Sequence, residues 1–184
     1  MKKRCEWAKD EPNTTYHDNE WGIPVHDDVI LFEFLILEGA QAGLSWSTIL
    51  NRRNGYRIAF SNFDVVAVSK YTQNHVKKLV QNKDIIRNKL KINSAINNAK
   101  QFIKIQKEFG SFDEYLWGFV NHKPIKNNFK KYSDLVCSSI ISEKLSQDLK
   151  KHGFTFVGPI ICYSLMQAVG MVNDHTSDCF KYAE

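Results

Sequence analysis

The longest helical pattern of the chain is IRNKLKINSAINNAKQFIKIQKE, residues 86–108. Apolar side chains recur in it at intervals of three and four residues, which places them along one side of a helix. Gly110 follows the pattern, and because glycine is common just beyond a helix, we expect the helix to end there. A helix of this kind buries its apolar side against other elements, so the stretch predicts a helical fold. The apolar members are Leu90, Ile92, Ile96, Phe102, Ile103 and Ile105.

Capping residues divide the N-terminal half into further helices. The Asp27–Asp28 pair precedes an apolar helix that we expect to run to about Gly39 or beyond. Ser45 precedes a second helix, which we expect to run unbroken over residues 46–60. Both patterns place capping oxygens directly before apolar residues at helical spacing, so they predict helix starts rather than strands.

The remaining sequence favours helices as well, because strict apolar alternation is rare in it. Residues 121–132 have the composition of an exposed loop. No internal repeat or linker divides the chain, so we expect an all-α fold of roughly eight helices in one unit, residues 1–184. The other expected helix starts are Asp64, Thr72, Ser111, Ser142 and Gly158-Pro159.

The composition is that of a globular protein, with 43% apolar and 24% charged residues. No apolar run reaches the roughly 18 residues that a membrane span needs. The basic start, MKKRCEW, has no apolar stretch behind it, so a secretory signal is not indicated. We expect a cytosolic monomer that does not associate with membranes.

Charge is distributed unevenly along the chain. Residues 1–50 contain four Lys or Arg and nine Asp or Glu, although the whole chain has a net charge of +5. Between Lys70 and Lys107, ten basic residues accompany one acid, Asp84. Such a stretch suits phosphate binding, but basic surfaces are also common in proteins that bind no nucleic acid.

Two cysteines and two histidines lie near the ends of the chain: Cys5, His17, His175 and Cys179. Thiolate and imidazole are the ligands that zinc prefers, and two of each complete a tetrahedral shell. The spacing alone also fits two unrelated cysteines and two polar histidines. The other cysteines, Cys137 and Cys162, follow apolar residues, and we expect both to be buried.

Glu38 follows the apolar run Leu35–Leu37 and so lies where burial is expected. A buried carboxylate must be paired, protonated or open to a cleft. A salt bridge or a solvent-facing helix end would explain it. Alternatively, beside aromatic rings it could bind a cationic base, since aromatic rings also stack on bases. The aromatic residues of this region are Trp7, Tyr16, Trp21 and Trp46.

Five segments resemble the bacterial DNA-3-methyladenine glycosylase I family, and together the resemblance spans nearly the whole chain. They are YHDNEWG (16–22), LEGAQAGLSW (37–46), FVN (119–121), GFTFVG (153–158) and GMVNDH (170–175). The resemblance implies a helix-hairpin-helix DNA glycosylase fold with a structural zinc ion that joins the chain termini. It maps the zinc ligands onto Cys5, His17, His175 and Cys179.

The resemblance also implies a base pocket. Its recognising carboxylate maps onto Glu38, its walls onto Tyr16 and Trp46, and its surrounding aromatics onto Trp7 and Trp21. The implied reaction is hydrolytic release of 3-methyladenine from flipped-out nucleotides, without a Schiff-base lysine. The implied partners are double-stranded alkylated DNA and the free base.

Two further segments are assigned to DNA. The resemblance maps Gly43-Leu44 onto the segment that enters the gap left by the extruded nucleotide. The basic stretch places Arg87 and Lys89 just after the predicted hairpin, residues 81–86, where we expect them to contact phosphates. The hairpin lacks the family's glycine, and Asn82 could adopt a left-handed conformation in its place.

The sequence departs from the family at the pocket as well. Between Pro12 and Tyr16 the family has one more residue and a tyrosine, in a Pro-Leu-Tyr pattern, whereas this chain has Asn13-Thr14-Thr15 and no tyrosine there. Two other functions remain open. A zinc-stapled nucleic-acid-binding module would explain the basic stretch but not Glu38. A zinc hydrolase or deaminase would need an open metal position, which four protein ligands do not leave.

Overall fold

A computed structural model describes residues 2–183, and its centre is helix α2, Asp28–Gln41. Every side chain from Leu31 to Ala40 in this helix is buried. A helix that is buried all round belongs to the interior of a fold. Asp27 begins it as expected, because its carboxylate accepts hydrogen bonds from the backbone N–H groups of Val29 and Ile30.

Asp28 joins α2 to two later helices, α7 (Lys89–Phe109) and α8 (Phe112–Gly118). Its carboxylate accepts hydrogen bonds from the Gln106 side chain at 2.7 Å and from the backbone of Phe112 and Asp113 at 3.0 and 2.8 Å. These bonds fix one end of the central helix against the turn between α7 and α8. Gly110 ends α7 at this turn, as the sequence predicts.

Helix α7 begins three residues later than the apolar pattern predicts. Asn88 is its N-cap and accepts from the backbone N–H groups of Leu90 and Lys91. Ile86 remains in the preceding connection, where its N–H donates to the Tyr56 hydroxyl at 3.2 Å. Arg87 therefore precedes the helix, and Lys89 is its first residue.

The helix expected over residues 46–60 is interrupted. Ser45 caps α3, Trp46–Leu50, but the chain turns at Asn51 and Arg52 before α4, Arg53–Ala59. Ion pairs account for the direction of α4, because Arg53 contacts both Glu33 at 2.7 Å and Glu20 at 2.6 Å. Glu33 is buried in α2, so these pairs compensate a carboxylate that would otherwise be costly to bury.

Short helices complete the N-terminal half. Asp64 caps α5, Val65–Ser69, and Thr72 caps α6, Gln73–Leu79, as the sequence predicts. A one-turn 3-10 helix, η1 (Ser61–Phe63), precedes them, and α1 spans Asn13–Asn19.

The C-terminal half contains two longer helices and an unexpected pair of strands. Pro159 opens α10, Pro159–Ala168, as predicted. Helix α9 spans Ile140–Lys151, and its cap is Ser139 rather than Ser142, which lies in the first turn and reaches back to the Ser139 N–H. The connection between α8 and α9 contains η2, Tyr132–Asp134, so residues 121–132 are not entirely irregular.

Strands β1 (Ile125–Lys126) and β2 (Val172–Asn173) pair in parallel. Two-residue strands leave no periodic signal, which explains why the sequence did not reveal them. The described residues thus form ten α-helices and one small sheet, rather than the roughly eight helices expected. None of these helices is long and apolar enough to cross a membrane.

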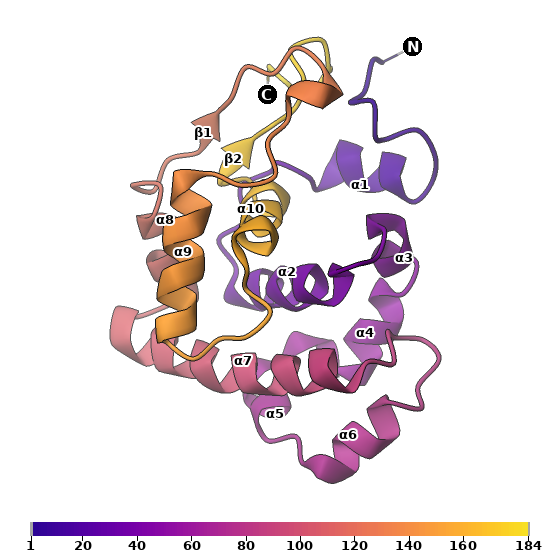
Figure 1. The fold of residues 1–184 in the computed structure, drawn as a ribbon, viewed down its shortest axis with the longest axis vertical. Coiled ribbons are helices and arrows are strands. Elements are labelled where there is room, and N and C mark those ends of the chain that lie inside the picture. Colours follow the sequence, from indigo (N-terminus) through magenta and orange to yellow (C-terminus); the bar gives the residue numbers. More distant parts are fainter. Residues whose placement is uncertain (1, 184) are drawn as a thin grey trace.

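Figure 1 shows how these elements are arranged. The two ends of the chain and the strand pair lie at one end of the molecule, while α5, α6 and α7 lie at the other. Helices α2 and α10 cross the space between them, and α1 and α3 lie to one side. The side chains of the candidate site come from these four helices, from the segments before and after α1, and from the segment around η2.

Candidate active site

A pocket of about 620 Å³ opens between α1, α2, α3, α10 and the segment that follows η2. Five of the predicted base-binding residues line it: Trp7, Tyr16, Trp21, Glu38 and Trp46. The sequence did not point to the rest of the wall. These further residues are Gln41, Tyr132, Ser133, Leu135, Val136, Cys137, Ile160, Tyr163, Ser164 and Gln167.

Glu38 lies in the last turn of α2 and is only 4% exposed. Burial raises the pKa of its carboxyl group to about 8. Its Oε2 atom is buried and has no hydrogen-bond partner among the described residues. Neither the salt bridge nor the solvent-facing helix end considered for this residue is present, so the carboxyl group is available to something that enters the pocket.

Aromatic rings surround this carboxyl group. The ring centroids of Tyr16 and Trp46 are 5.3 Å apart, and those of Trp7 and Trp21 are 5.0 Å apart in an edge-on arrangement. The Trp46 Nε1 atom is also buried without a partner in the described part of the chain. A pocket with an unpaired donor, an unpaired acceptor and several ring faces suits a flat, polar and cationic ligand.

One side of the pocket is supported by Asp174, which is fully buried. Its carboxylate accepts hydrogen bonds from the Tyr163 hydroxyl, the Gln167 amide and the Asn127 amide, at 2.8, 2.8 and 2.7 Å. Tyr163 and Gln167 line the pocket, so this network holds two of its polar groups in place. The network joins residues up to 47 positions apart, which no sequence spacing indicates.

The segment after η2 forms the mouth of the pocket and corrects one expectation. Cys137 is exposed, although its apolar neighbours predict burial, because this segment runs along the pocket rather than through the core. Cys162 is buried as expected, in α10. Asn13 does not line the pocket.

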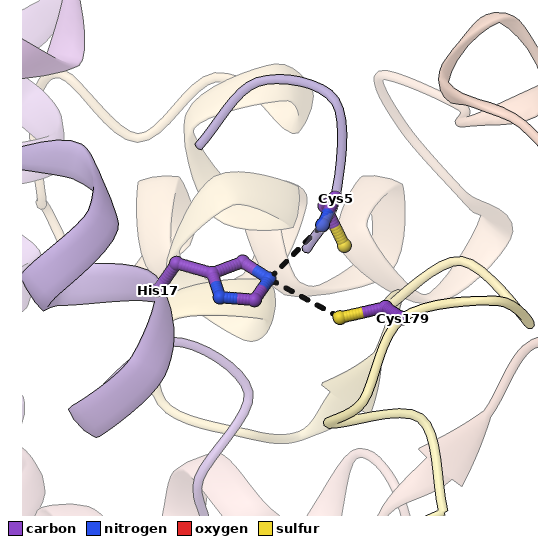
Figure 2. A group of neighbouring side chains, drawn as sticks. All are labelled: Cys5, His17 and Cys179. Carbon is purple, nitrogen blue, oxygen red and sulfur yellow. Dashed lines mark hydrogen bonds between the residues drawn. The ribbon is translucent and has the colours of Figure 1, made fainter. Parts of the chain in front are cut away.

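The residues expected to bind metal gather at the end of the molecule where the termini meet. One ligand atom each of Cys5, His17 and Cys179 lies within 4.8 Å of the others, and all three residues are buried. Figure 2 shows their side chains converging from three segments, with His17 Nε2 3.4 Å from the Cys179 sulfur. The other ring nitrogen of His17 contacts Asp18 at 2.9 Å, which directs Nε2 towards the two sulfurs.

His175 lies beside this group. Its ring centroid is 5.0 Å from that of His17, and its Nδ1 atom contacts Asn173 at 3.0 Å. Its Nε2 atom is buried with no partner among the described residues. Gly22 permits this placement, since a Cβ atom there would come within 2.8 Å of the His175 ring.

The structure brings Cys5, His17 and Cys179 together as possible metal ligands, while His175 lies next to this group and outside it. Burial lowers the pKa of His17 and lowers that of His175 to about 3, so both imidazoles are neutral, as metal ligands must be. Burial also raises the pKa of Cys5 to about 12, which disfavours a thiolate unless a cation lies beside it. The Cys5–His17–Cys179 group could therefore hold a metal ion.

The predicted DNA-contacting residues lie outside the pocket. Gly43 and Leu44 follow α2 directly, between the pocket residues Gln41 and Trp46, and Leu44 is 39% exposed. Arg87 and Lys89 are exposed at the start of α7. Both residues belong to the basic stretch between Lys70 and Lys107.

The hairpin before α7 forms without a left-handed residue at Asn82. Asn82 is not among the described residues with positive φ, and instead its side chain accepts a hydrogen bond from the Asp84 N–H at 2.9 Å. Gly55 lets the hairpin lie against α4, because a Cβ atom at this position would overlap the Asp84 carbonyl. The expectation of a left-handed Asn82 is wrong, and a side-chain turn takes its place.

A helical fold with a buried, unpaired carboxyl group among aromatic rings defines a protein that binds a cationic aromatic base. The family model for methyladenine glycosylase matches residues 7–182, so this chain belongs to the methyladenine glycosylase family.

Individual relatives agree with this assignment. The chain is 45% identical to DNA-3-methyladenine glycosylase 1 of Escherichia coli over 98% of this chain and 97% of that protein. It is 41% identical to DNA-3-methyladenine glycosylase of Haemophilus influenzae over 97% of each. A crystal structure of a variant of 3-methyladenine DNA glycosylase I in complex with 3-methyladenine is similar with a TM-score of 0.95 and 34% identity, covering 98% of both chains.

Proposed function

We propose that this protein is a monofunctional DNA N-glycosylase that releases 3-methyladenine from alkylated DNA and leaves an abasic site. One observation carries the proposal: the pocket presents a buried, unpaired Glu38 oxygen and a buried, unpaired Trp46 Nε1 among aromatic rings. A neutral apolar ligand would leave both polar atoms unsatisfied. The complex of a relative with 3-methyladenine supports the same choice of base.

Methylation at N3 makes the adenine in DNA cationic and weakens its bond to the sugar. When the C1′–N9 bond breaks, its electron pair moves to the base, which leaves as a neutral molecule. Water supplies the new C1′–O bond and releases a proton. A strong general acid is not needed, because the base departs without gaining a proton.

The pocket residues would act by holding the cation. Stacking of the base on an aromatic ring of the pocket, such as Trp46, would contribute about 1–3 kcal/mol and tolerates a positive charge. The arriving cation would favour the ionised form of Glu38, whose pKa burial raises in the empty pocket. The charge on Glu38 would then stabilise both the cationic base and the positive charge that develops on the sugar.

The base must leave the duplex before it reaches this pocket. Leu44 lies on the loop beside the pocket and would fill the gap, while Gly43 gives the loop its turn, with φ of +79°. Arg87 and Lys89 would hold phosphates of double-stranded DNA on one side of the lesion. The hairpin between α6 and α7, which Gly55 and Asn82 support, corresponds to the hairpin of a helix-hairpin-helix fold.

A structural zinc ion would bind Cys5, His17, His175 and Cys179 and join the two ends of a single unit that works as a monomer. Four protein ligands would complete a tetrahedral shell, so the zinc ion would have no open position for water. This argues against a zinc hydrolase or deaminase. No lysine lines the pocket among the described residues, which supports direct attack by water rather than a Schiff base.

The test is base release from methylated duplex DNA under single-turnover conditions. We expect the purified protein to release 3-methyladenine and to leave alkali-sensitive abasic sites without cutting the strand itself. Binding of methylated duplex without base release would favour the binding module. Strand cleavage trapped by borohydride would contradict a monofunctional mechanism.

A further inference from the structure

The C-terminal end of α2 is held by a lysine from another helix. The Lys91 ammonium group donates hydrogen bonds to the backbone carbonyls of Ala40 and Ala42, at 2.7 and 2.6 Å. The last carbonyls of a helix have no partner within the helix, and its dipole favours a cation there. Lys91 is therefore a charged cap that comes from α7.

The loop that this cap supports is the one that carries Leu44. Ala42 is the C-cap of α2, and Gly43 and Leu44 follow it directly. The Leu44 N–H donates to the Gln41 carbonyl at 2.6 Å and closes a turn. The Gln41 carbonyl lies in the sequence between the Ala40 and Ala42 carbonyls, which both accept from Lys91. Leu44 itself is partly exposed, and its place relative to the pocket depends on how the turn leaves the helix.

Lys91 also connects this loop to the proposed phosphate-binding segment. It lies in the first turn of α7, two residues after Lys89 and four after Arg87. Its position is fixed by the Asn88 cap and by the Tyr56 hydroxyl, which accepts from Ile86 in the same connection. Its side chain is half-buried, and the loss of water around the ammonium group lowers its pKa.

We propose that Lys91 is a positioning residue that holds the Gly43-Leu44 loop against the phosphate-binding start of α7, so that Leu44 enters the gap when α7 engages the DNA backbone. This inference rests on the proposed function. It assigns to Lys91 a role in base extrusion and none in binding the free base, because Lys91 does not line the pocket. Unlike Lys89, which lies two residues earlier, it would not act on phosphates.

The test uses Lys91→Met, which keeps the aliphatic stem but removes the charge, and Lys91→Arg, which can still donate to two carbonyls. Lys100→Met is the matched control, since Lys100 is exposed on the same helix. The first readout is fluorescence of 2-aminopurine placed beside an abasic-site analogue in duplex DNA, which reports entry of Leu44 into the gap without any base chemistry. The second is single-turnover release of 3-methyladenine, and the third is binding of free 3-methyladenine.

For Lys91→Met we expect loss of most of the fluorescence change and a roughly tenfold or greater fall in excision from duplex DNA, with binding of the free base unchanged. Lys91→Arg should restore both signals, and Lys100→Met should behave as the wild type. Thermal unfolding of each variant separates a folding defect from a local one, because Lys91→Arg keeps the fold testable if Lys91→Met loses it.

Wild-type fluorescence and excision in a folded Lys91→Met protein would overturn the inference. Equal losses of excision and free-base binding would also overturn it, since they would show damage to the pocket. If Lys91→Met does not fold, a Lys91→Arg protein that folds but lacks the fluorescence change overturns it. Absence of base release from the wild-type protein would overturn the proposed function instead, and the fluorescence change would still report on Lys91.

Discussion

Glu38 is a carboxyl group whose charge depends on what shares its pocket. In the empty pocket burial favours its neutral form, and a cation would favour the ionised form. Its apolar neighbours in the sequence predict burial, and the structure agrees. Sequence position could not show that Oε2 lacks a partner, because that depends on side chains from α1, α3 and α10 that meet only in the folded chain.

Replacing Glu38 by glutamine keeps its shape and removes its charge. We expect single-turnover release of 3-methyladenine to fall roughly tenfold or more, each factor of ten being about 1.4 kcal/mol of lost transition-state stabilisation. Metal content and secondary structure should not change. Glu143→Gln, at an exposed position of α9, is the control. Full activity in the Glu38→Gln protein would contradict the role given to this carboxylate.

The same substitution has a consequence for stability that depends on pH. The folded-state pKa of Glu38 is about 8, above the ordinary 4.5, so the folded protein retains a proton that the unfolded chain has lost. Between these values the wild type loses stability as pH rises, at up to about 1.4 kcal/mol per pH unit. The Glu38→Gln protein does not titrate at this position, so we expect it to gain on the wild type from pH 5 to pH 8 in urea unfolding. A constant difference would contradict the raised pKa.

At the scale of elements, local chemistry determined where helices begin. Asp27, Ser45 and Asp64 each accept backbone hydrogen bonds from the helix that follows, as their sequence positions predict. Where the predicted helix bounds are wrong, the cause is a contact with a distant part of the chain. Helix α4 separates from α3 where Arg53 pairs with Glu33 on another helix, and the Ile86 N–H is taken by Tyr56, so α7 starts late. The pocket wall after η2 was missed for a similar reason, since it has no periodic pattern of its own.

The proposed phosphate binding at the start of α7 can be tested by removing its positive charges. Replacing Arg87 and Lys89 with glutamine should weaken binding to any duplex and reduce the dependence of log K on log salt by about two, one for each phosphate that is no longer neutralised. Fluorescence anisotropy at several salt concentrations measures this slope. The control is Lys150→Gln combined with Lys151→Gln at the end of α9, which lies beside the last turn of α7 rather than its start, since His152 contacts Glu108 at 3.8 Å. If both double variants change the slope equally, the phosphate-binding face is not at α7.

At the scale of the whole molecule, three of the four expected ligands, Cys5, His17 and Cys179, come together although nearly the whole chain separates them, and His175 lies beside them. The residue types alone suggested possible metal ligands, and the resemblance mapped the zinc ligands onto these residues. Supporting groups such as Asp18, which orients His17, and Gly22, which leaves room for His175, became evident only in three dimensions. A side chain that fixes the orientation of a ligand leaves no periodic trace.

Metal analysis tests this arrangement directly. The purified protein should contain about one zinc ion per chain, and Cys179→Ser should lose it and unfold more easily by about 2 kcal/mol or more. Cys137→Ser is the matched control, because Cys137 is exposed and outside the group. Well under half an equivalent of zinc in freshly purified, untreated wild-type protein would contradict the prediction.

The meeting of distant segments also sets the order of events during synthesis. The pocket needs Trp7 and Tyr16 from early in the chain and Tyr163 from late in it, and the Phe180 N–H donates to the Lys3 carbonyl. A ribosome makes the early segment first, and that segment cannot reach these C-terminal partners until residues 160–180 have left the exit tunnel. The protein is therefore unable to bind its base while it is being translated, and any premature stop before Cys179 removes the partners that Lys3 and Cys5 have near the C-terminus.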